Sequence, residues 1–418
     1  MSVAVSDPQS VPRVGLAAPA PSTPLGPFAD SAVAWMMWVT LMGFVGAVAL
    51  TLFCAGPAAR RLGSQTLVLV TTRLARLALP VGVLALPALL TVLARDASEG
   101  VGYDYGAAWH SLYDGTNAGR LAGLEFTLTA VAVVLIAPLA MPVGARSRVS
   151  TWLLGAGLLS GTVALGSTKF PAKAPDDWGR TSFATGMWML HLIGGAVWIG
   201  GLLGLLALAI PRGVGARRGE FWSRVIRRFS AVAMSCVAAI GLSGLFLYWE
   251  HVDGPSQLLT TMYGRVLGVK VVIFSGLLLL GAVNQFWLHP RIEASRRAGD
   301  DRPLRTILAR DFPLVVAVEL VLGLSVLFVA PFLHGSARNQ AYQAAAAEHA
   351  GPAQPTPAKI APKQVSASTW VWGTAETVVV VAVMAVGYCA SGRIARSRAS
   401  RTGDQIAEVV RERATSAS

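Results

Sequence analysis

Long apolar segments alternate along the chain with short polar connections rich in Pro and Gly. A hydrocarbon core of about 30 Å requires roughly 20 apolar residues in an α-helix. About nine segments meet this requirement, near residues 32–55, 66–94, 121–142, 149–168, 182–210, 228–249, 264–288, 312–333 and 369–390. The pattern predicts an all-α fold, a polytopic transmembrane helical bundle of about nine spans.

The connections between these segments alternate in charge. Arginine clusters follow the first, third, fifth, seventh and ninth segments. The other connections are poorer in Lys and Arg and contain Asp96, Glu99, Asp104, Asp114, Asp176, Asp177, Glu250 and Asp253. Cytoplasmic loops of membrane proteins carry an excess of Lys and Arg. We therefore expect a multi-pass protein of the cytoplasmic (inner) membrane, with its N-terminus outside and its C-terminus cytoplasmic.

Composition shifts divide the chain further. Segments rich in Pro, Ala, Ser and Gln cannot bury enough apolar surface to fold alone. We expect a disordered N-terminal tail (1–30), N-terminal transmembrane helices (31–150) and a second transmembrane domain (151–333). A disordered outer loop (334–368), an additional transmembrane helix (369–391) and a cytoplasmic tail (392–418) should follow.

The composition argues against several classes of protein. The chain is 54% hydrophobic and only 14% charged, which is too apolar for an ordinary soluble protein. Its net charge of +13 is not accompanied by a zinc-finger, RNA-recognition or basic-aromatic pattern, so we expect the lipid bilayer as partner and no nucleic acid.

The three cysteines are far apart, which indicates neither a disulfide framework nor a thiol metal clamp. No GxxxxGK[ST] loop is present, and we expect the chain not to be an enzyme.

One histidine lies inside an apolar span, in the stretch GMWMLHLIGGAVWIGG at residues 186–201. Polar groups at membrane depth are costly and tend to be functional. Met187 precedes His191 by one helical turn and shares its face. Imidazole and thioether together suit Cu(I) or an axial heme set, so we predict His191 and Met187 as metal ligands. An interhelical hydrogen bond from His191, with Met187 as packing, is the structural alternative. His334, at the outer end of the eighth span, is a further candidate ligand.

Three charged residues also lie within predicted spans. Glu125 is close enough to the end of the third span to extend to the outer surface. Lys270 lies in the seventh span and Glu319 in the eighth, where an unpaired charge is costly. Asn284 is closer to the level of Glu319 than Lys270 is. Glu319, Lys270 and Asn284 are interpreted either as a structural clasp between helices or as a relay for protons or cations.

Several stretches resemble the copper-resistance D (CopD/PcoD) family of membrane proteins. LHLIGGAVWIGGLLGLL at 190–206 is similar to a family segment with His, Trp and Gly-Gly-Leu, and YGRVLGVKVVIFSGLLLLGAVNQFWLHPRI at 263–292 to one with Tyr-Gly-Arg, Lys, Asn and Pro-Arg. VELVLGLSVLFVAPFL at 318–333 resembles the helix that follows. The second transmembrane domain, 151–333, is thus CopD-like. One family histidine is absent, with Ser167 where it is expected.

The resemblance implies movement of copper across the cytoplasmic membrane, often beside a separate periplasmic CopC-like copper-binding protein. We therefore predict copper transport, in the direction of uptake, in copper homeostasis or resistance. The alternative is a membrane scaffold or assembly factor for a respiratory or copper-enzyme complex that transports nothing. A heme-binding electron carrier ranks third, because it normally requires paired histidines on facing helices.

Overall fold

The protein is an all-helical bundle. The computed structural model describes residues 28–100, 102–209, 218–283, 312–333, 335–349, 363 and 365–416. The long helices in these ranges are α1 (Phe28–Leu50), α3 (Ser64–Ala97), α5 (Asn117–Ile136), α7 (Ser150–Ser167), α8 (Trp178–Ala209), α9 (Arg218–His251), α11 (Met262–Val283), α14 (Phe312–Val329) and α16 (Ala367–Ser416). The shorter helices are η1 (Thr51–Ala55), α2 (Gly56–Arg60), α4 (Tyr105–Ser111), η2 (Ala137–Ala140), α6 (Pro142–Arg146), α10 (Gln257–Thr260), η5 (Ala330–Phe332) and α15 (Ala337–His349). No residue of these ranges lies in a strand, which confirms the all-α prediction.

The predicted membrane spans correspond to the long helices. Eight helical stretches, built on α1, α3, α5, α8, α9, α11, α14 and α16, are long and apolar enough to cross a membrane. The fourth predicted span corresponds to α7, which has 18 residues and is not among the eight. Its sequence, STWLLGAGLLSGTVALGS, is diluted by Gly, Ser and Thr. These small residues allow close helix contact, and α7 packs along α5 and α1.

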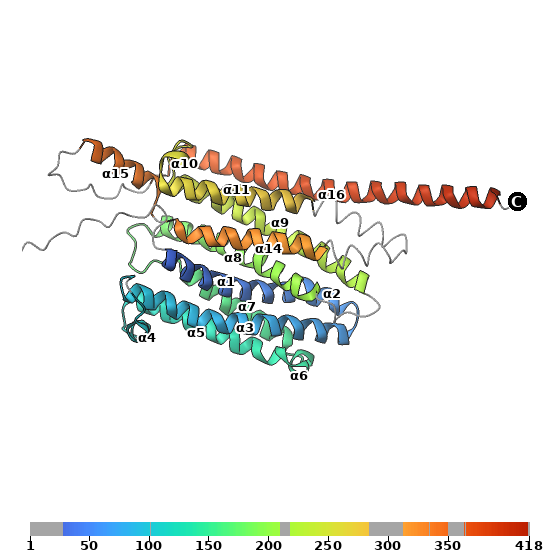
Figure 1. The fold of residues 1–418 in the computed structure, drawn as a ribbon, viewed down its shortest axis with the longest axis horizontal. Helices are drawn as coiled ribbons and strands as arrows, with labels where there is room; N and C mark the ends of the chain where they lie inside the picture. Colours follow the sequence, from blue (N-terminus) through green and yellow to red (C-terminus); the bar gives the residue numbers. More distant parts are fainter. Residues whose placement is uncertain are drawn as a thin grey trace, which may run out of the picture.

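Helix α1 lies in the middle of the bundle (Figure 1). It packs against α3, α8, α7 and α14, and Phe44 and Val45 at its centre are completely buried. Helices α9 and α11 lie on the other side of α8 and α14, and α5 lies beside α3 and α7. The core is therefore organised around α1 and the helices that surround it.

Helices α1 and α8 meet in direct backbone contact at two glycines. A Cβ atom on Gly200 would lie 2.6 Å from the Cα of Gly46 and 2.7 Å from the carbonyl oxygen of Met42. These distances are shorter than real Cβ contacts, so any side chain here would force the helices apart. Small residues of this kind allow transmembrane helices to pack tightly without an aqueous hydrophobic effect.

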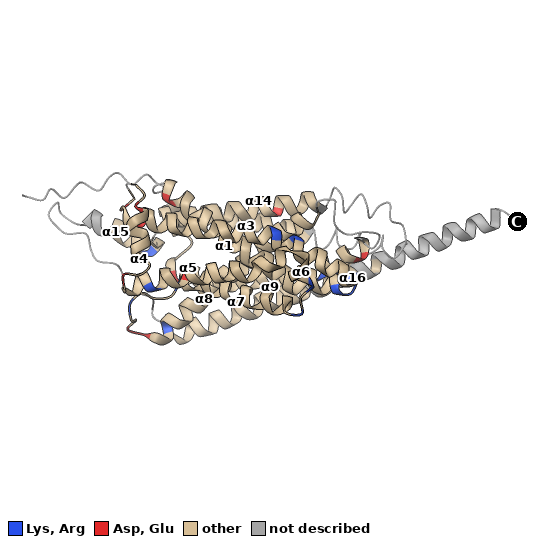
Figure 2. Cartoon of the chain, turned by 90° about the horizontal axis from the view of Figure 1, so that it is seen from below, with Lys and Arg blue, Asp and Glu red and all other residues tan. Residues whose placement is uncertain are grey.

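Charged residues gather at the two ends of the bundle, and the helix segments between the ends contain few (Figure 2). We name each end by a short helix: the α4 end also holds α10 and α15, and the α6 end also holds α2 (Figure 1). Arg60, Arg76 and Arg146 belong to helix segments at the α6 end. This segregation is the pattern expected of a bundle that crosses a bilayer along its long axis.

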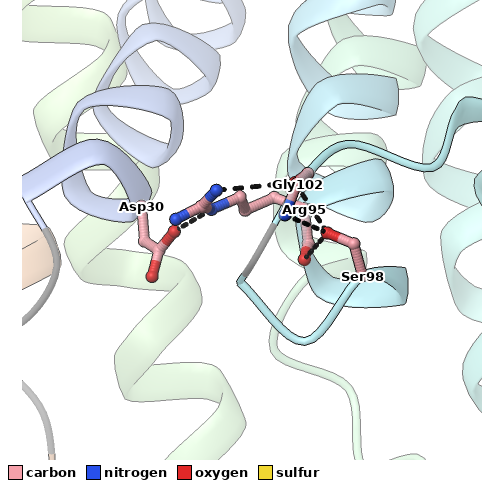
Figure 3. A network of polar contacts seen from close by, with 4 residues as sticks. All are labelled: Asp30, Arg95, Ser98 and Gly102. Atoms are coloured by element: carbon pink, nitrogen blue, oxygen red, sulfur yellow. Dashed lines mark hydrogen bonds and ion pairs between the residues drawn. The ribbon is translucent and has the colours of Figure 1, made fainter.

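A polar network joins α1 and α3 at the α4 end (Figure 3). Asp30, near the start of α1, forms an ion pair with Arg95, near the end of α3. Arg95 Nη1 also donates to the carbonyl oxygen of Gly102 at 3.5 Å, and Ser98 Oγ donates to the same oxygen at 2.6 Å. The network fixes the turn after α3 against the first turn of α1.

Two segments differ from the predicted boundaries. Residues 337–349, inside the predicted disordered outer loop, form α15, whose sequence ARNQAYQAAAAEH is rich in alanine, the strongest helix former. The predicted span 369–391 and the predicted tail 392–418 are largely one helix, α16, of 50 residues. No proline interrupts this sequence. A helix of this length spans about 75 Å, and α16 extends well beyond the α6 end (Figure 1).

Removal of α16 is expected to leave the rest of the bundle folded. Its apolar segment, with Trp370, Val371 and Trp372 exposed, buries almost nothing, and α9 is the long helix against which it packs. Deletion of residues 367–418 should therefore shift the thermal midpoint in detergent by no more than about 4 °C, the shift that corresponds to about 1 kcal/mol. A larger fall, measured by circular dichroism against the full chain, would show that α16 is part of the core.

Candidate functional site

His191 of α8 is held by a hydrogen bond to the neighbouring helix α9. The His191 Nδ1 and Ser243 Oγ atoms are 3.0 Å apart, and Ser243 is completely buried. Ser243 Oγ donates its proton to the carbonyl oxygen of Ala239 at 2.6 Å. Its oxygen therefore accepts the proton of His191 Nδ1–H, because a hydroxyl has one proton to donate. This assigns the neutral tautomer in which Nε2 keeps its lone pair, the form that ligates metals.

Met187 lies one turn before His191 on the same face of α8, as predicted. Both side chains are half-buried. A thioether and an imidazole with a free Nε2 lone pair form a soft donor pair that suits Cu(I). In the described ranges no group of three or more His, Cys, Asp or Glu side chains is close enough to hold a metal ion. Copper ligation by His191 and Met187 therefore remains a prediction from two donors.

An aromatic column connects His191 with the α4 end. The ring of Trp188 lies 6.4 Å from that of His191 and 6.5 Å from that of His251, measured between centroids. His251 stacks on Tyr263 at 5.8 Å, and its Nδ1 bonds the carbonyl oxygen of Leu247 at 2.8 Å. His251 is the last residue of α9 and half-buried, because Tyr263 of α11 covers it.

Lys270 of α11 lies at the level of His191. The ring centroids of Trp198 on α8 and Phe274 on α11 are 6.1 Å apart, which aligns the two helices. From this contact, His191 lies two turns and Lys270 one turn towards the α4 end. Its ammonium group is close enough to act electrostatically on the His191 ring. The structure thus brings Lys270 to the predicted metal ligand rather than to Glu319.

Glu319 lies much deeper than His191. It is buried in α14, with 4% of its surface exposed. Gly323, one turn from Glu319 on α14, packs on Ile199 of α8. Glu319 lies four residues from this contact towards the α6 end, and His191 lies eight residues from it towards the α4 end. The two residues are therefore separated by about twelve residues of helix rise, or about 18 Å along the bundle. The two other predicted site residues, His334 and Asn284, lie outside the described residues.

Glu125 of α5 does not extend to the surface, as the sequence suggested, but lies inside the bundle with 7% of its surface exposed. The reason is the contact of α5 with α7, where Ser160 Oγ donates to the carbonyl oxygen of Leu128 at 2.8 Å. This contact turns the Glu125 face of α5 inwards. Position along the span, which was the basis of the prediction, does not determine which face is buried.

Lys169 follows α7, and its ammonium group interacts electrostatically with the Glu125 carboxyl group. Its Nζ atom lies 4.6 Å from the centre of the Trp188 ring and 5.8 Å from that of Trp38. Burial lowers the pKa of Lys169 from its ordinary value, and the Glu125 carboxylate partly opposes this shift. Ser167, at the position of the absent family histidine, is buried and donates to the carbonyl oxygen of Ala164 at 2.7 Å. Nothing in the sequence pattern identified Lys169 or Ser243 as part of the site.

Comparisons with known proteins agree with this picture. Residues 223–333 match the family model described as "Copper resistance protein D" (CopD). A curated relative, "Copper transport protein CutJ" of Bacillus subtilis (strain 168), is 26% identical over 312 residues, which cover 72% of this chain and 52% of that protein. The chain thus spans about half the length of the curated relative it matches. No solved structure matches the chain.

The matched segment contains Ser243 of α9 and Lys270 of α11, the two residues that act on His191. It also contains Glu319 of α14, which lies deeper in the bundle. His191 itself, on α8, lies before the segment. The resemblance noted in the sequence is confirmed, since residues 223–333 of this multi-pass membrane protein match the copper resistance protein D (CopD) family.

Proposed function

We propose that the protein transports copper across the cytoplasmic membrane in the direction of uptake and contributes to copper homeostasis or resistance. The single observation that carries the proposal is the hydrogen bond between His191 Nδ1 and Ser243 Oγ, which leaves Nε2 as the nitrogen for a metal, with Met187 one helical turn away on α8. The CopD match and the copper transport protein of Bacillus subtilis support copper as the cargo.

The distribution of charge supports an orientation. Arg60 of α2, Arg76 of α3 and Arg146 of α6 belong to segments at the α6 end, and basic residues favour the cytoplasmic side. The α4 end is then outside, and copper reaches His191 past His251 and Trp188. The acidic groups at the α4 end include Glu250, whose Oε2 atom lies 3.9 Å from His251 Nδ1. A separate periplasmic CopC-like protein would deliver copper at this end.

A scaffold for a respiratory or copper-enzyme complex is the second candidate function. Helix α16 favours it, because its exposed face, with Trp370, Trp372 and Val378, is buried by no other part of the described chain. In a transporter this face contacts lipid, whereas in a scaffold it contacts another membrane protein. The scaffold function requires no copper at His191.

Cellular copper measurement separates the two functions. A strain that lacks the protein should contain less copper than wild type in copper-limited medium, and expression of the full chain should restore the level, with cellular zinc as the control that stays constant. The measurement is elemental mass spectrometry of washed cells. Equal copper in the two strains would contradict transport and favour the scaffold, and a higher level in the deletion strain would contradict uptake.

A further inference from the structure

A second polar site lies on α5, away from the CopD segment. Glu125 and Thr129 are one turn apart on the same face, with 7% and 1% of their surfaces exposed. Glu125 Oε1 and Thr129 Oγ1 are both buried without a hydrogen-bond partner among the described residues. A buried polar atom without a partner is destabilising. Two such atoms on one helix face indicate a place where something small and polar binds.

The charge that faces this site comes from Lys169. Its ammonium group acts electrostatically on the Glu125 carboxylate. Helix α7, packed against α5, contains no titratable residue, nor does η2. On α3, the charged groups nearest in level are Arg95 and Asp96 at the α4 end, where Asp30 acts on both. Glu125 and Lys169 therefore interact electrostatically as a pair, with no second cation in the described surroundings.

The pair lies in the same layer of the bundle as His191. Met189 packs on Gly166 near the end of α7, which places His191 and the end of α7 at one level. Trp188 connects them, because its ring faces both the Lys169 ammonium and the His191 imidazole. Lys270 acts on His191 from the other side. A metal cation that arrives at His191 therefore meets two ammonium groups in a medium of low dielectric constant.

We infer that Glu125, with Thr129 and Lys169, is a proton-binding site coupled to cation binding at His191. Before the cation binds, Lys169 is an ammonium group and the Glu125 carboxyl group carries a proton. When a monovalent cation binds at His191, the O–H bond of Glu125 breaks and its proton passes to water at the α4 end, which leaves a carboxylate that faces the Lys169 ammonium group. One positive charge enters and one leaves, so the charge of the layer is unchanged. This coupling rests on the proposed transport function.

The test is the number of protons released when silver binds. Ag⁺ is a redox-inert stand-in for Cu⁺, and the neutral His191 has no proton to lose at Nε2. The purified full chain in weakly buffered detergent, titrated with silver nitrate beside a pH indicator, should release about one proton per bound ion, as metal sites coupled to protonation do. Bound silver is measured in parallel by equilibrium dialysis.

Three variants locate the source of the proton. Glu125→Gln, which keeps the shape of the side chain, should release less than about half as many protons per bound silver ion, and Glu125→Asp should restore the release. Glu99→Gln, in an exposed turn at the α4 end, should release as many as wild type. Thr129→Ala provides a second measurement if Glu125→Gln does not fold, and should lower the release.

The possible outcomes are distinct. Silver binding without proton release would overturn the coupling and leave the proposed transport function intact. Release from Glu125→Gln, or from Thr129→Ala where the first variant does not fold, that equals wild type would overturn the assignment to this site. Absence of silver binding to the folded wild-type chain would overturn both the coupling and the role of His191 in transport.

Discussion

Replacement of Gly200 by leucine is expected to destabilise the bundle by about 3 kcal/mol or more, the upper range for overpacking a dense interior. A Cβ at this position would lie 2.6 Å from the Cα of Gly46 and 2.9 Å from the carbonyl oxygen of Gly43. The obstacle is backbone, which cannot rotate away as a flexible side chain can. Helices α1 and α8 would have to separate, and the buried surface of α1 would be lost with them.

Gly195→Leu is the matched control on the same helix. A Cβ on Gly195 meets nothing within 4 Å, so this substitution should leave the thermal midpoint close to wild type. The measurement is the loss of the monodisperse peak in size-exclusion chromatography after heating in detergent. Equal midpoints for Gly200→Leu and wild type would mean that the two helices are not held in the contact described here.

Replacement of His191 by alanine is expected to weaken silver or Cu(I) binding by more than about 100-fold, because loss of a group that only orients a ligand already costs about 10–100-fold. The substitution removes the Nε2 donor and leaves the Met187 thioether alone. Ser243→Ala should weaken binding by about 10-fold, since it leaves the imidazole in place but frees its tautomer and orientation. The order of these two effects follows from the hydrogen bond between Nδ1 and Ser243 Oγ.

His110→Ala is the control for this series. His110 lies in α4 and is exposed, so its removal should leave the affinity unchanged. Affinities are measured by competition with a chromophoric Cu(I) chelator. Wild-type affinity in His191→Ala would place the metal elsewhere and leave His191 with the structural role of a bond between α8 and α9.

Hydropathy was sufficient to locate the long helices, because each needs about 20 apolar residues and the connections are visibly polar. It was less informative at α7, where Gly, Ser and Thr replace large apolar residues on the side that packs closely along α5 and α1. At α16 the apolar segment was found, but the helix continues far beyond it. Capping residues or proline determine where a helix ends, and the hydropathy of a segment does not indicate either of them.

The pairing of His191 with Met187 followed from helical periodicity alone, since both lie on one helix. Its bond to Ser243 joins residues 52 positions apart, and no periodicity relates two different helices. Glu125 shows the same limit, because its burial depends on how α5 packs on α7. Lys169 was not identified because it follows a span rather than lying inside one, although its side chain reaches the Trp188 ring.

The contact between Gly46 and Gly200 has a consequence for biosynthesis. The two residues are 154 positions apart in the sequence, so at about 5–20 residues per second a ribosome needs on the order of 8–30 s to make the second after the first. During that interval the glycine surface of α1 has no α8 to cover it. The nascent chain thus passes through a stage in which its most central helix is exposed to lipid or to the insertion machinery.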